Sequence, residues 1–519
     1  MKDTVQNQAA DTVIIGNRHL SIEDVVDAAD GRRPVRLSQD DSFRERIARG
    51  GAYLERLLAN NGTVYGVNTG YGESCTVTVP SDLVQELPLH LTRYHGCGLG
   101  RHLDEPATRA VLVTRLNSLA QGYSGVRVAL LEQIEHLLVH DALPLIPEEG
   151  SVGASGDLTP LSYVAAALVG ERELHYRGAV RPTAEVLAEL DIAPLKLKPK
   201  EGLAIMNGTS VMTALACQAW SRADYLSRLT TRITALASMA MQGNRGHFDP
   251  RLFAAKPHAG QAEAADWIFT DLPEDTDDGA MRLQDRYSIR CAPHVIGVLR
   301  DALPWMRRDI ENELNSANDN PLIDPDADWV LHGGHFYGGH IAFVMDAMKT
   351  AVANLADLLD RQVALMVDSK FNHGLPQNLS GATAERAMIN HGFKAVQIGA
   401  SAWTAEALKL TMPASVFSRS TECHNQDKVS MGTIAARDCL RVLELSEQVA
   451  AAALLAANQG LALRLKTGEL AAEALPAPVL AFHQQVSSLS ALVTEDRPLE
   501  ADLRATLAAM RAKTWTLYA

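Results

Sequence analysis

The sequence predicts a mainly α-helical protein in which a smaller mixed N-terminal domain precedes a bundle of long helices. Aromatic residues make up only 5% of the 519 residues while alanine and leucine are abundant, a composition that favours packed helices over β-sandwiches. The ranges 211–242, 341–373 and 433–459 contain no glycine or proline, and their apolar residues recur three and four apart. Long helices with wide apolar faces have to pack on several neighbours, so we expect a helical bundle.

The N-terminal part is built differently. Glycine and proline interrupt residues 1–210 often, and short β-like pieces alternate there with modest helices. A helix is predicted over 105–121, because Pro106 stands near its start and Gly122 follows its end. We therefore expect one domain over residues 1–210 and a second, helical one over residues 211–519.

Two further boundaries are expected on the C-terminal side. Gly460 directly follows the glycine-free range 433–459, and glycine commonly terminates helices, so the helix is expected to stop there. The acidic stretch LPEDTDDGA (272–280) is expected to form an exposed loop.

Charge and composition argue against several functional classes. The chain carries 62 acidic and 48 basic residues, a formal charge of −14, which is a poor basis for binding nucleic acid or an anionic membrane. Its most apolar run, 449–457, is too short to span a bilayer, and its first residues lack the apolar core of a signal peptide. Six scattered cysteines form no C-x-x-C pair, so neither a zinc site nor a disulfide framework is indicated. We expect a cytoplasmic protein.

Histidines give no signal for a metal. His90 and His95 are five residues apart and three more histidines fall within 332–340, but no H-E-x-x-H or comparable carboxylate spacing accompanies them. We expect no metal in the active site.

The glycine-rich stretch GSVGASGDLTP (150–160) carries the chemistry. It has no Lys for a phosphate-binding loop, and G-x-S-x-G fails at its last position. One alternative is a plain turn. The other is a condensation in which the Gly156 amide nitrogen attacks the Ala154 carbonyl, and loss of two waters leaves a methylene on an imidazolone ring. Glycine leaves that nitrogen unhindered, Ser155 supplies the hydroxyl that is lost, and the product is an electrophile that no ordinary side chain provides.

The stretch GSVGASGDLTPLSYVAAALVGE resembles the signature of the aromatic amino acid ammonia-lyases, which comprise the histidine, phenylalanine and tyrosine lyases and their aminomutase relatives. Further motifs match in the right order: YGVNTGYG (65–72), EGLAIMNGTSVMT (201–213), QDRYSIRCAP (284–293), NSANDNP (315–321) and HNQDKVSMG (424–432). The resemblance implies that Ala154-Ser155-Gly156 becomes 4-methylidene-imidazol-5-one (MIO) and that no external cofactor is needed. It also implies a homotetramer of long helices whose active sites are shared between subunits.

The resemblance also assigns roles. Tyr65 is the base that removes the β-hydrogen of the substrate, and we expect the site to lower its pKa from the usual value near 10. Arg290 binds the substrate carboxylate, Tyr287 lies near the amine, and Asn207 hydrogen-bonds near MIO. The implied catalytic set is Tyr65, Ala154, Ser155, Gly156, Asn207, Tyr287 and Arg290. The implied substrate-binding positions are Gly72, Tyr94, His95, Gln284, Asn320, Phe336, Asn425 and Gln426. One departure is His335, where the family commonly has asparagine.

Two positions bear on the substrate ring. Tyr94-His95 is similar to the Ser-His of histidine lyases and of one group of bacterial tyrosine lyases and aminomutases, and a histidine there suits a phenol or an imidazole. Gln426 stands where histidine lyases usually carry glutamate, which argues against imidazole. Together they predict L-tyrosine as the substrate and trans-4-hydroxycinnamate (p-coumarate) and ammonia as the products. The alternatives are a histidine ammonia-lyase, a phenylalanine ammonia-lyase, a tyrosine 2,3-aminomutase or an inactive scaffold homologue.

Overall fold

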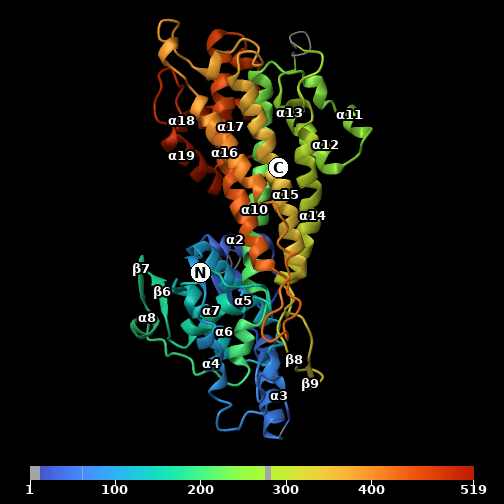
Figure 1. The fold of residues 1–519 in the computed structure, drawn as a ribbon, viewed down its shortest axis with the longest axis vertical. Coiled ribbons are helices and arrows are strands. Elements are labelled where there is room, and N and C mark those ends of the chain that lie inside the picture. The colour runs from blue at the N-terminus through green and yellow to red at the C-terminus, as the bar shows by residue number, and fades with distance from the viewer. Residues whose placement is uncertain (1–11, 61, 275–281, 519) are drawn as a thin grey trace, which may run out of the picture. The chain divides into compact units, whose positions relative to one another are not determined.

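The computed structural model describes residues 12–60, 62–274 and 282–518. It is mostly helical with a few short strands, which confirms the predicted fold class (Figure 1). Contacts divide the chain into two compact units. Unit 1 comprises residues up to 221, 306–346 and 413–437, and unit 2 comprises 222–305, 347–412 and 438–519. The sequence-based division near residue 210 stays a prediction.

Unit 1 mixes short helices with four small sheets. Its helices are α2 (Ile22–Ala29), α3 (Asp41–Ala59), α4 (Leu87–Tyr94), α5 (Glu105–Ala120), α6 (Val128–Val139), α7 (Leu158–Leu168), α8 (Thr183–Glu189), α9 (Glu201–Met206) and the 3-10 turn η1 (Gly72–Thr76). Its strands are β1 (Val13–Ile15), β2 (Val35–Leu37), β3 (Leu99–His102), β4 (Leu143–Pro144), β5 (Pro147–Glu149), β6 (Glu173–Tyr176), β7 (Ala179–Pro182), β8 (Leu322–Asp324) and β9 (Trp329–Leu331). β1 and β2 pair in parallel, and the pairs β3–β5, β4–β6, β6–β7 and β8–β9 are antiparallel.

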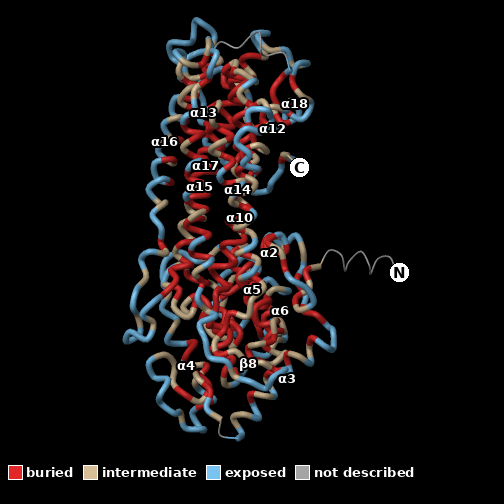
Figure 2. Tube along the Cα trace, turned by 90° about the vertical axis from the view of Figure 1, so that its right-hand side faces the viewer, coloured by how far each residue is buried: buried red, intermediate tan, exposed pale blue. Residues whose placement is uncertain are grey.

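Helix α5 forms the centre of unit 1. Asp104 caps it by accepting the Ala107 N–H at 2.9 Å, Pro106 stands in its first turn, and Gly122 after its end has φ +82°. The predicted helix over 105–121 is thereby confirmed to within one residue. The helix is buried from Thr108 onward except for one position, and α2, α6 and α9 pack against it (Figure 2).

Four long helices have residues in both units: α10 (Ser210–Ala240), α14 (Ala292–Leu314), α15 (Gly339–Val367) and α17 (Gly432–Thr467). Three of them confirm the long helices predicted from 211–242, 341–373 and 433–459, although the second ends six residues early. Unit 2 adds η2 (Arg245–Phe248), α11 (Pro250–Ala254), α12 (Ala259–Asp271), α13 (Tyr287–Arg290), η3 (Gln377–Leu379), η4 (Ala387–Ile389), α16 (Lys394–Lys409), η5 (Ala472–Ala474), α18 (Ala477–Leu489) and α19 (Glu500–Arg511).

The predicted helix end at Gly460 is wrong. Helix α17 continues through this residue to Thr467. A Cβ at Gly460 would lie 2.9 Å from the Ala240 Cβ of α10, so the glycine allows two helices of unit 2 to approach closely. The expected acidic loop over 272–280 lies mostly outside the described residues.

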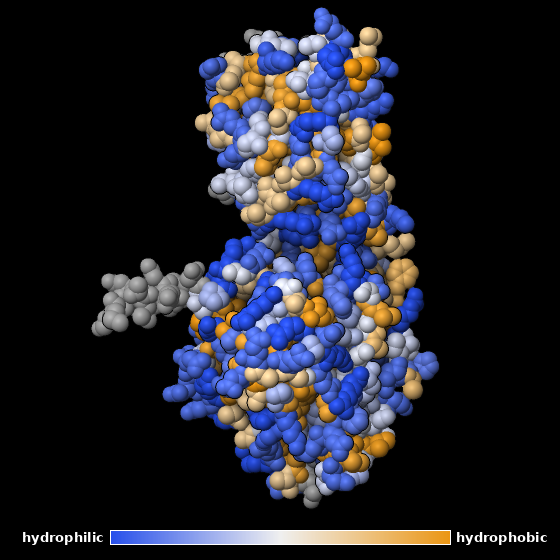
Figure 3. All heavy atoms as spheres, turned by 90° about the vertical axis from the view of Figure 1, so that its left-hand side faces the viewer, coloured by the Kyte–Doolittle hydropathy of each residue, from blue (hydrophilic) through white to orange (hydrophobic). Residues whose placement is uncertain are grey.

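The molecular surface is largely hydrophilic on the face that Figure 3 shows. Apolar residues are scattered among the hydrophilic ones on this face. Within the described residues, none of the helices combines the length and apolar character that a membrane span needs.

Candidate active site

The glycine-rich loop of residues 150–157 has an unusual backbone. Ser155 has φ +51° and Gly156 φ +83°, a left-handed region that residues other than glycine rarely adopt. The Asp157 N–H donates to the Gly208 carbonyl at 2.8 Å, and the Gly208 N–H donates to the Ser155 carbonyl at 3.1 Å. A Cβ on Gly156 would lie 2.0 Å from the Gly208 oxygen, so only glycine fits there.

The two groups that would condense are left unengaged by this arrangement. Within the described part of the chain, no hydrogen bond involves the Gly156 N–H or the Ala154 carbonyl. Their neighbours Ser155 and Asp157 are both held by Gly208. The loop is therefore fixed on either side of the Gly156 residue that carries the free nitrogen, and the free Ala154 carbonyl precedes it.

Asp157 anchors the loop to the start of α10. Its Oδ2 accepts the N–H groups of Val211 and Met212, each at 3.0 Å, and its Oδ1 accepts the hydroxyl of Thr433. Asp157 is fully buried, and this burial raises its pKa to about 6 against the opposing effect of those hydrogen bonds. A carboxylate at a helix N-terminus is also favoured by the helix dipole.

Asn207 presents an unpaired acceptor beside this loop. Its amide nitrogen donates to the Asn320 carbonyl at 2.8 Å, while its Oδ1 is buried and has no hydrogen-bond partner among the described residues. A buried unpaired acceptor is costly, by about 1–3 kcal/mol, and calls for a donor, which the ammonium group of a bound amino acid can supply. The free Gly156 N–H and the free Ala154 carbonyl are the observations that fit a ring formed from residues 154–156.

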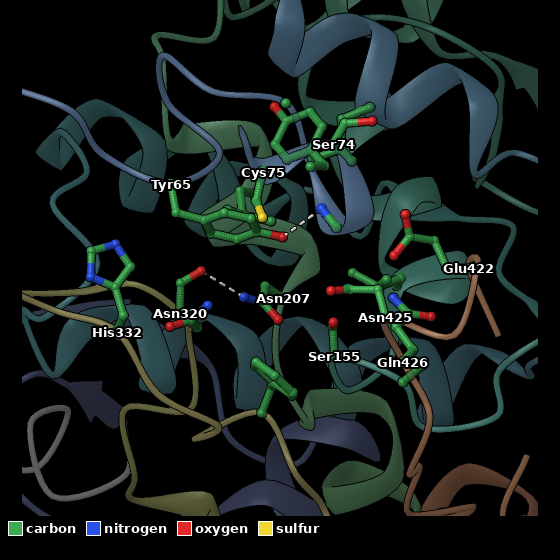
Figure 4. Close-up of a pocket in the computed structure, with 18 of the residues that line it drawn as sticks. Tyr65, Ser74, Cys75, Ser155, Asn207, Asn320, His332, Glu422, Asn425 and Gln426 are labelled. Carbon is green, nitrogen blue, oxygen red and sulfur yellow. Dashed lines mark hydrogen bonds between the residues drawn. The ribbon is translucent and has the colours of Figure 1, made fainter. Parts of the chain in front are cut away.

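A pocket of about 1160 Å³ opens over this loop, and unit 1 residues line it. Eleven predicted site residues line the pocket: Tyr65, Gly72, Tyr94, His95, Ala154, Ser155, Asn207, Asn320, Phe336, Asn425 and Gln426. In Figure 4 the side chains of Tyr65, Ser155, Asn207 and Asn425 surround one space, although they come from four separate segments of the chain. Gly156 is buried directly behind Ser155.

Tyr65 is held by the first residue of the turn η1. Its hydroxyl oxygen accepts the Gly72 N–H at 2.8 Å (Figure 4). Burial raises its pKa, the Gly72 hydrogen bond partly opposes this, and the nearby Glu422 charge raises the pKa further. For the described residues of a single chain the pKa of Tyr65 is raised and not lowered as expected, because burial and a neighbouring carboxylate outweigh the Gly72 hydrogen bond.

His95 and Gln426 offer complementary polar groups to a substrate ring. The Nδ1 of His95 contacts the Leu91 carbonyl at 3.0 Å, so Nδ1 carries the proton and Nε2 is an acceptor. Burial lowers the pKa of His95, which keeps the ring neutral. Gln426 accepts the Thr421 hydroxyl through Oε1 at 2.8 Å, which leaves its amide N–H groups as donors.

Besides Gly156, three predicted site residues do not line this pocket. Gln284, Tyr287 and Arg290 belong to unit 2, whereas the pocket is lined by unit 1. Tyr287 and Arg290 share one turn as predicted, with the guanidinium 4.6 Å from the centre of the Tyr287 ring. Arg290 donates through Nε to the Asp285 carbonyl at 2.9 Å, and Tyr287 is 72% exposed.

Sequence reasoning missed Glu422. This carboxylate lines the pocket and accepts the N–H of Glu73 at 2.9 Å, so it touches the turn that holds Tyr65. Glu422, Cys423 and His424 all have positive φ, a run that is sparsely populated by residues other than glycine. Its position just before the HNQD motif was the signal available in the sequence.

Of the three histidines within 332–340, one lines the pocket. His332 lines the pocket, but His335, which departs from the family pattern, does not (Figure 4). Across the described ranges, no group of three or more histidine, cysteine or acidic residues is arranged to hold a metal ion.

The helical fold and the pocket over the glycine-rich loop match those of one family of enzymes. The aromatic amino acid lyase family model matches residues 20–486. Histidine ammonia-lyase of Geobacillus sp. (strain WCH70) is 36% identical over 477 residues, which cover 91% of this chain and 92% of that protein.

Solved structures of related enzymes have the same fold as this chain. The histidine ammonia-lyase of Trypanosoma cruzi superposes with a TM-score of 0.88 at 30% identity, covering 97% of this chain and 94% of that one. A tyrosine aminomutase of Streptomyces globisporus gives 0.89 at 32% identity, covering 97% of both chains. This chain belongs to the aromatic amino acid lyase family, and membership supports a carbon–nitrogen lyase acting on small amino acids.

Proposed function

We propose that the protein releases ammonia from an aromatic L-amino acid by means of an electrophile made from residues 154–156. The observation that carries this proposal is the loop held by Gly208 on both sides of the free Gly156 N–H, beside the unpaired Oδ1 of Asn207. MIO in this position would supply the electrophile that makes the substrate nitrogen a good leaving group.

The side chains of the pocket supply binding and proton transfer. Tyr65 takes the β-proton of the substrate onto its hydroxyl oxygen once it is deprotonated, and the Gly72 N–H stabilises the phenolate by hydrogen bonding. Asn207 orients the substrate through its carboxamide. Leu91, Phe336 and the buried loop exclude water from one side of the pocket, which strengthens each of these polar interactions.

The ring of the substrate is proposed to be polar. His95 presents an acceptor at Nε2, and Gln426 presents donor N–H groups. A phenol or a neutral imidazole offers one donor and one acceptor and pairs with both. A benzene ring leaves them unpaired, at a cost of about 1–3 kcal/mol.

L-Histidine is the first candidate, with urocanate as its product. Relatives that align with most of this chain at 35–38% identity are histidine ammonia-lyases, so they favour histidine over the tyrosine predicted from two positions. The carboxylate of Glu422 lines the same pocket and offers an acid that an imidazole N–H can use.

L-Tyrosine, giving p-coumarate, is the second candidate, and one residue favours it. Gln426 is neutral at the position where the resemblance places a glutamate in histidine lyases. A tyrosine aminomutase is also among the structural neighbours, which supports a site of this shape accommodating a phenol.

Arg290 is proposed to bind the carboxylate in a site completed by another copy of the chain. Gln284, Tyr287 and Arg290 are absent from the unit 1 pocket of the same chain. A homotetramer with shared active sites, as the resemblance implies, would bring them there from a neighbouring subunit. Mixing inactive Tyr65→Phe and Arg290→Met chains, then refolding them together, should restore activity in the mixed oligomers.

The deciding experiment is a product assay. Purified enzyme is incubated separately with L-histidine, L-tyrosine and L-phenylalanine, and urocanate, p-coumarate and cinnamate are followed by their ultraviolet absorbance while β-amino acids are sought by chromatography. Histidine or tyrosine should exceed phenylalanine in kcat/KM. A preference for phenylalanine would overturn the proposed polar ring, and accumulation of β-tyrosine would identify an aminomutase.

A further inference from the structure

A second set of charges lies behind the loop and does not line the pocket. Arg115, on the central helix α5, is fully buried, and its guanidinium donates to the Ala204 carbonyl at 2.8 Å. The other terminal nitrogen makes longer contacts of 3.3–3.4 Å with the carbonyl of Asn207, the hydroxyl of Ser210 and the side-chain oxygen of Asn318. Arg115 therefore holds the Asn207–Gly208 turn from its inner side.

The charge of Arg115 is balanced inside the protein. Lys200 and Asp319 form a buried ion pair beside it, and Asp157 adds a second negative charge to the same region. Burial lowers the pKa of Arg115 to about 10 while these two carboxylates oppose the shift, so the guanidinium stays cationic at neutral pH. This buried cation is costly to remove, because the negative charges of Asp157 and Asp319 then exceed the positive charge of Lys200 in the same region.

The position of Gly208 connects this charge to the loop. A Cβ on Gly208 would lie 2.1 Å from an Arg115 terminal nitrogen, so the guanidinium packs directly on the glycine backbone. On its other side, the same glycine binds the Ser155 carbonyl and the Asp157 N–H and leaves the Gly156 N–H free. Arg115 and the loop thus contact opposite sides of one turn.

We propose that Arg115 is a positioning residue for the self-condensation of residues 154–156. Arg115 acts through the Asn207–Gly208 turn. The inference rests on the proposed function, because it requires that MIO forms from residues 154–156. The Gly156 nitrogen bonds to the Ala154 carbonyl carbon. The first water leaves with the Ala154 carbonyl oxygen and with one hydrogen each from the Gly156 and Ser155 nitrogens, and a double bond forms between the Ala154 carbonyl carbon and the Ser155 nitrogen. The second water leaves with the Ser155 hydroxyl and the Ser155 α-hydrogen, and the methylene double bond forms. No oxidant or reductant is needed.

The test follows the mass of newly made protein. Wild type, Arg115→Lys and Arg115→Met chains are made by cell-free synthesis, and the chain that is two waters lighter is measured over time by intact mass spectrometry. We expect Arg115→Met to lose water at least about tenfold more slowly than wild type, since small misplacements of reacting groups cost this much or more. Arg115→Lys keeps the charge and should recover part of the rate.

Arg464 provides the matched control. It is also a buried arginine that donates to main-chain carbonyls, those of Ala240 and Asn372, but it belongs to unit 2. Arg464→Met should lower the melting temperature and still lose both waters at the wild-type rate. A folded Arg115→Met chain that matures as fast as Arg464→Met would overturn the proposal.

A second variant covers the case in which Arg115→Met does not fold. Gly208→Ala places a methyl group against the guanidinium, and Gly178→Ala, at φ +79° with nothing within 4 Å, controls for backbone strain alone. Slow loss of water in Gly208→Ala but not in Gly178→Ala supports the proposal, and equal rates contradict it. A wild-type chain that never loses water would instead refute the proposed function.

Discussion

The floor and the rim of the pocket are built in different ways. The floor, residues 150–157 with 207–208, is largely buried, and carboxylate, hydroxyl and main-chain hydrogen bonds hold it. The rim, residues 70–75 and 421–428, is mostly exposed and is held by a few contacts such as Glu73 to Glu422. We therefore expect the floor to determine which reaction the pocket carries out. Residues of the rim are expected to determine which substrate is bound and how the rate depends on pH.

The largest effect is expected at Tyr65, where rim and floor meet. Tyr65→Phe removes the hydroxyl that we propose takes the β-proton, and we expect kcat to fall by about 10²–10⁴-fold, as is typical of losing a general base. Steady-state kinetics measure this.

Tyr71 is the matched control, because it lines the same pocket and its hydroxyl is likewise removed by substitution with Phe. Tyr71→Phe should change kcat far less. Equal losses in the two variants would show that Tyr65 is not the base.

A smaller effect is expected from His95→Phe, which removes the acceptor for a polar ring. We expect kcat/KM for histidine and tyrosine to fall by about 5–150-fold, corresponding to about 1–3 kcal/mol for an unpaired polar group, while phenylalanine gains or is unchanged. Equal losses for all three substrates would show that His95 supports the fold of the rim and does not select the ring.

Gln426→Glu sharpens the comparison between the two candidate substrates. A carboxylate there favours an imidazole N–H, so the ratio of kcat/KM for histidine to that for tyrosine should rise by about tenfold. Asn425→Asp adds the same charge one residue away and serves as the control. An unchanged ratio in Gln426→Glu would remove this residue from substrate selection.

The smallest effect concerns pH. Because burial and Glu422 raise the pKa of Tyr65, its base form grows with pH, and kcat/KM should rise on the alkaline side of neutral. Glu422→Gln removes the negative charge, so the pKa of Tyr65 falls and this rise should move to lower pH by about one unit or less.

Glu73→Gln is the control for the pH experiment, because the Glu422 contact uses the Glu73 main-chain N–H and not its side chain. Its pH profile should match that of wild type. A profile of Glu422→Gln that moves to higher pH would contradict the assignment of Tyr65.

Local signals explain what could be predicted from the sequence. The residues that begin and end α5 lie within a few positions of the helix ends, and the Ala-Ser-Gly triplet is likewise a local motif. The helix end predicted at Gly460 is wrong because this glycine allows close packing against Ala240, which is 220 positions away in the chain. The raised pKa of Tyr65 depends on burial and on Glu422, and neither is visible in the YGVNTGYG motif.

The buried charges behind the loop of residues 150–157 could not be predicted from the sequence, for the same reason. Arg115 lies in a predicted helix where no motif marks it as functional. Only the folded chain brings it into contact with Gly208 and Asn318. Arg290 shows the opposite limit, since its motif was evident in the sequence but the residue does not line the pocket of the same chain. Residues that act through distant contacts need the structure, while residues in a local motif do not.

Intact mass spectrometry combined with a deamination assay tests the central claim, the condensation at residues 154–156, most directly. Wild-type protein should be two waters lighter than its sequence and should release ammonia, whereas Ser155→Ala should lack the second loss of water and be almost inactive. Wild-type protein of full sequence mass that still deaminates its substrate, or Ser155→Ala that works as fast as wild type, would contradict the account.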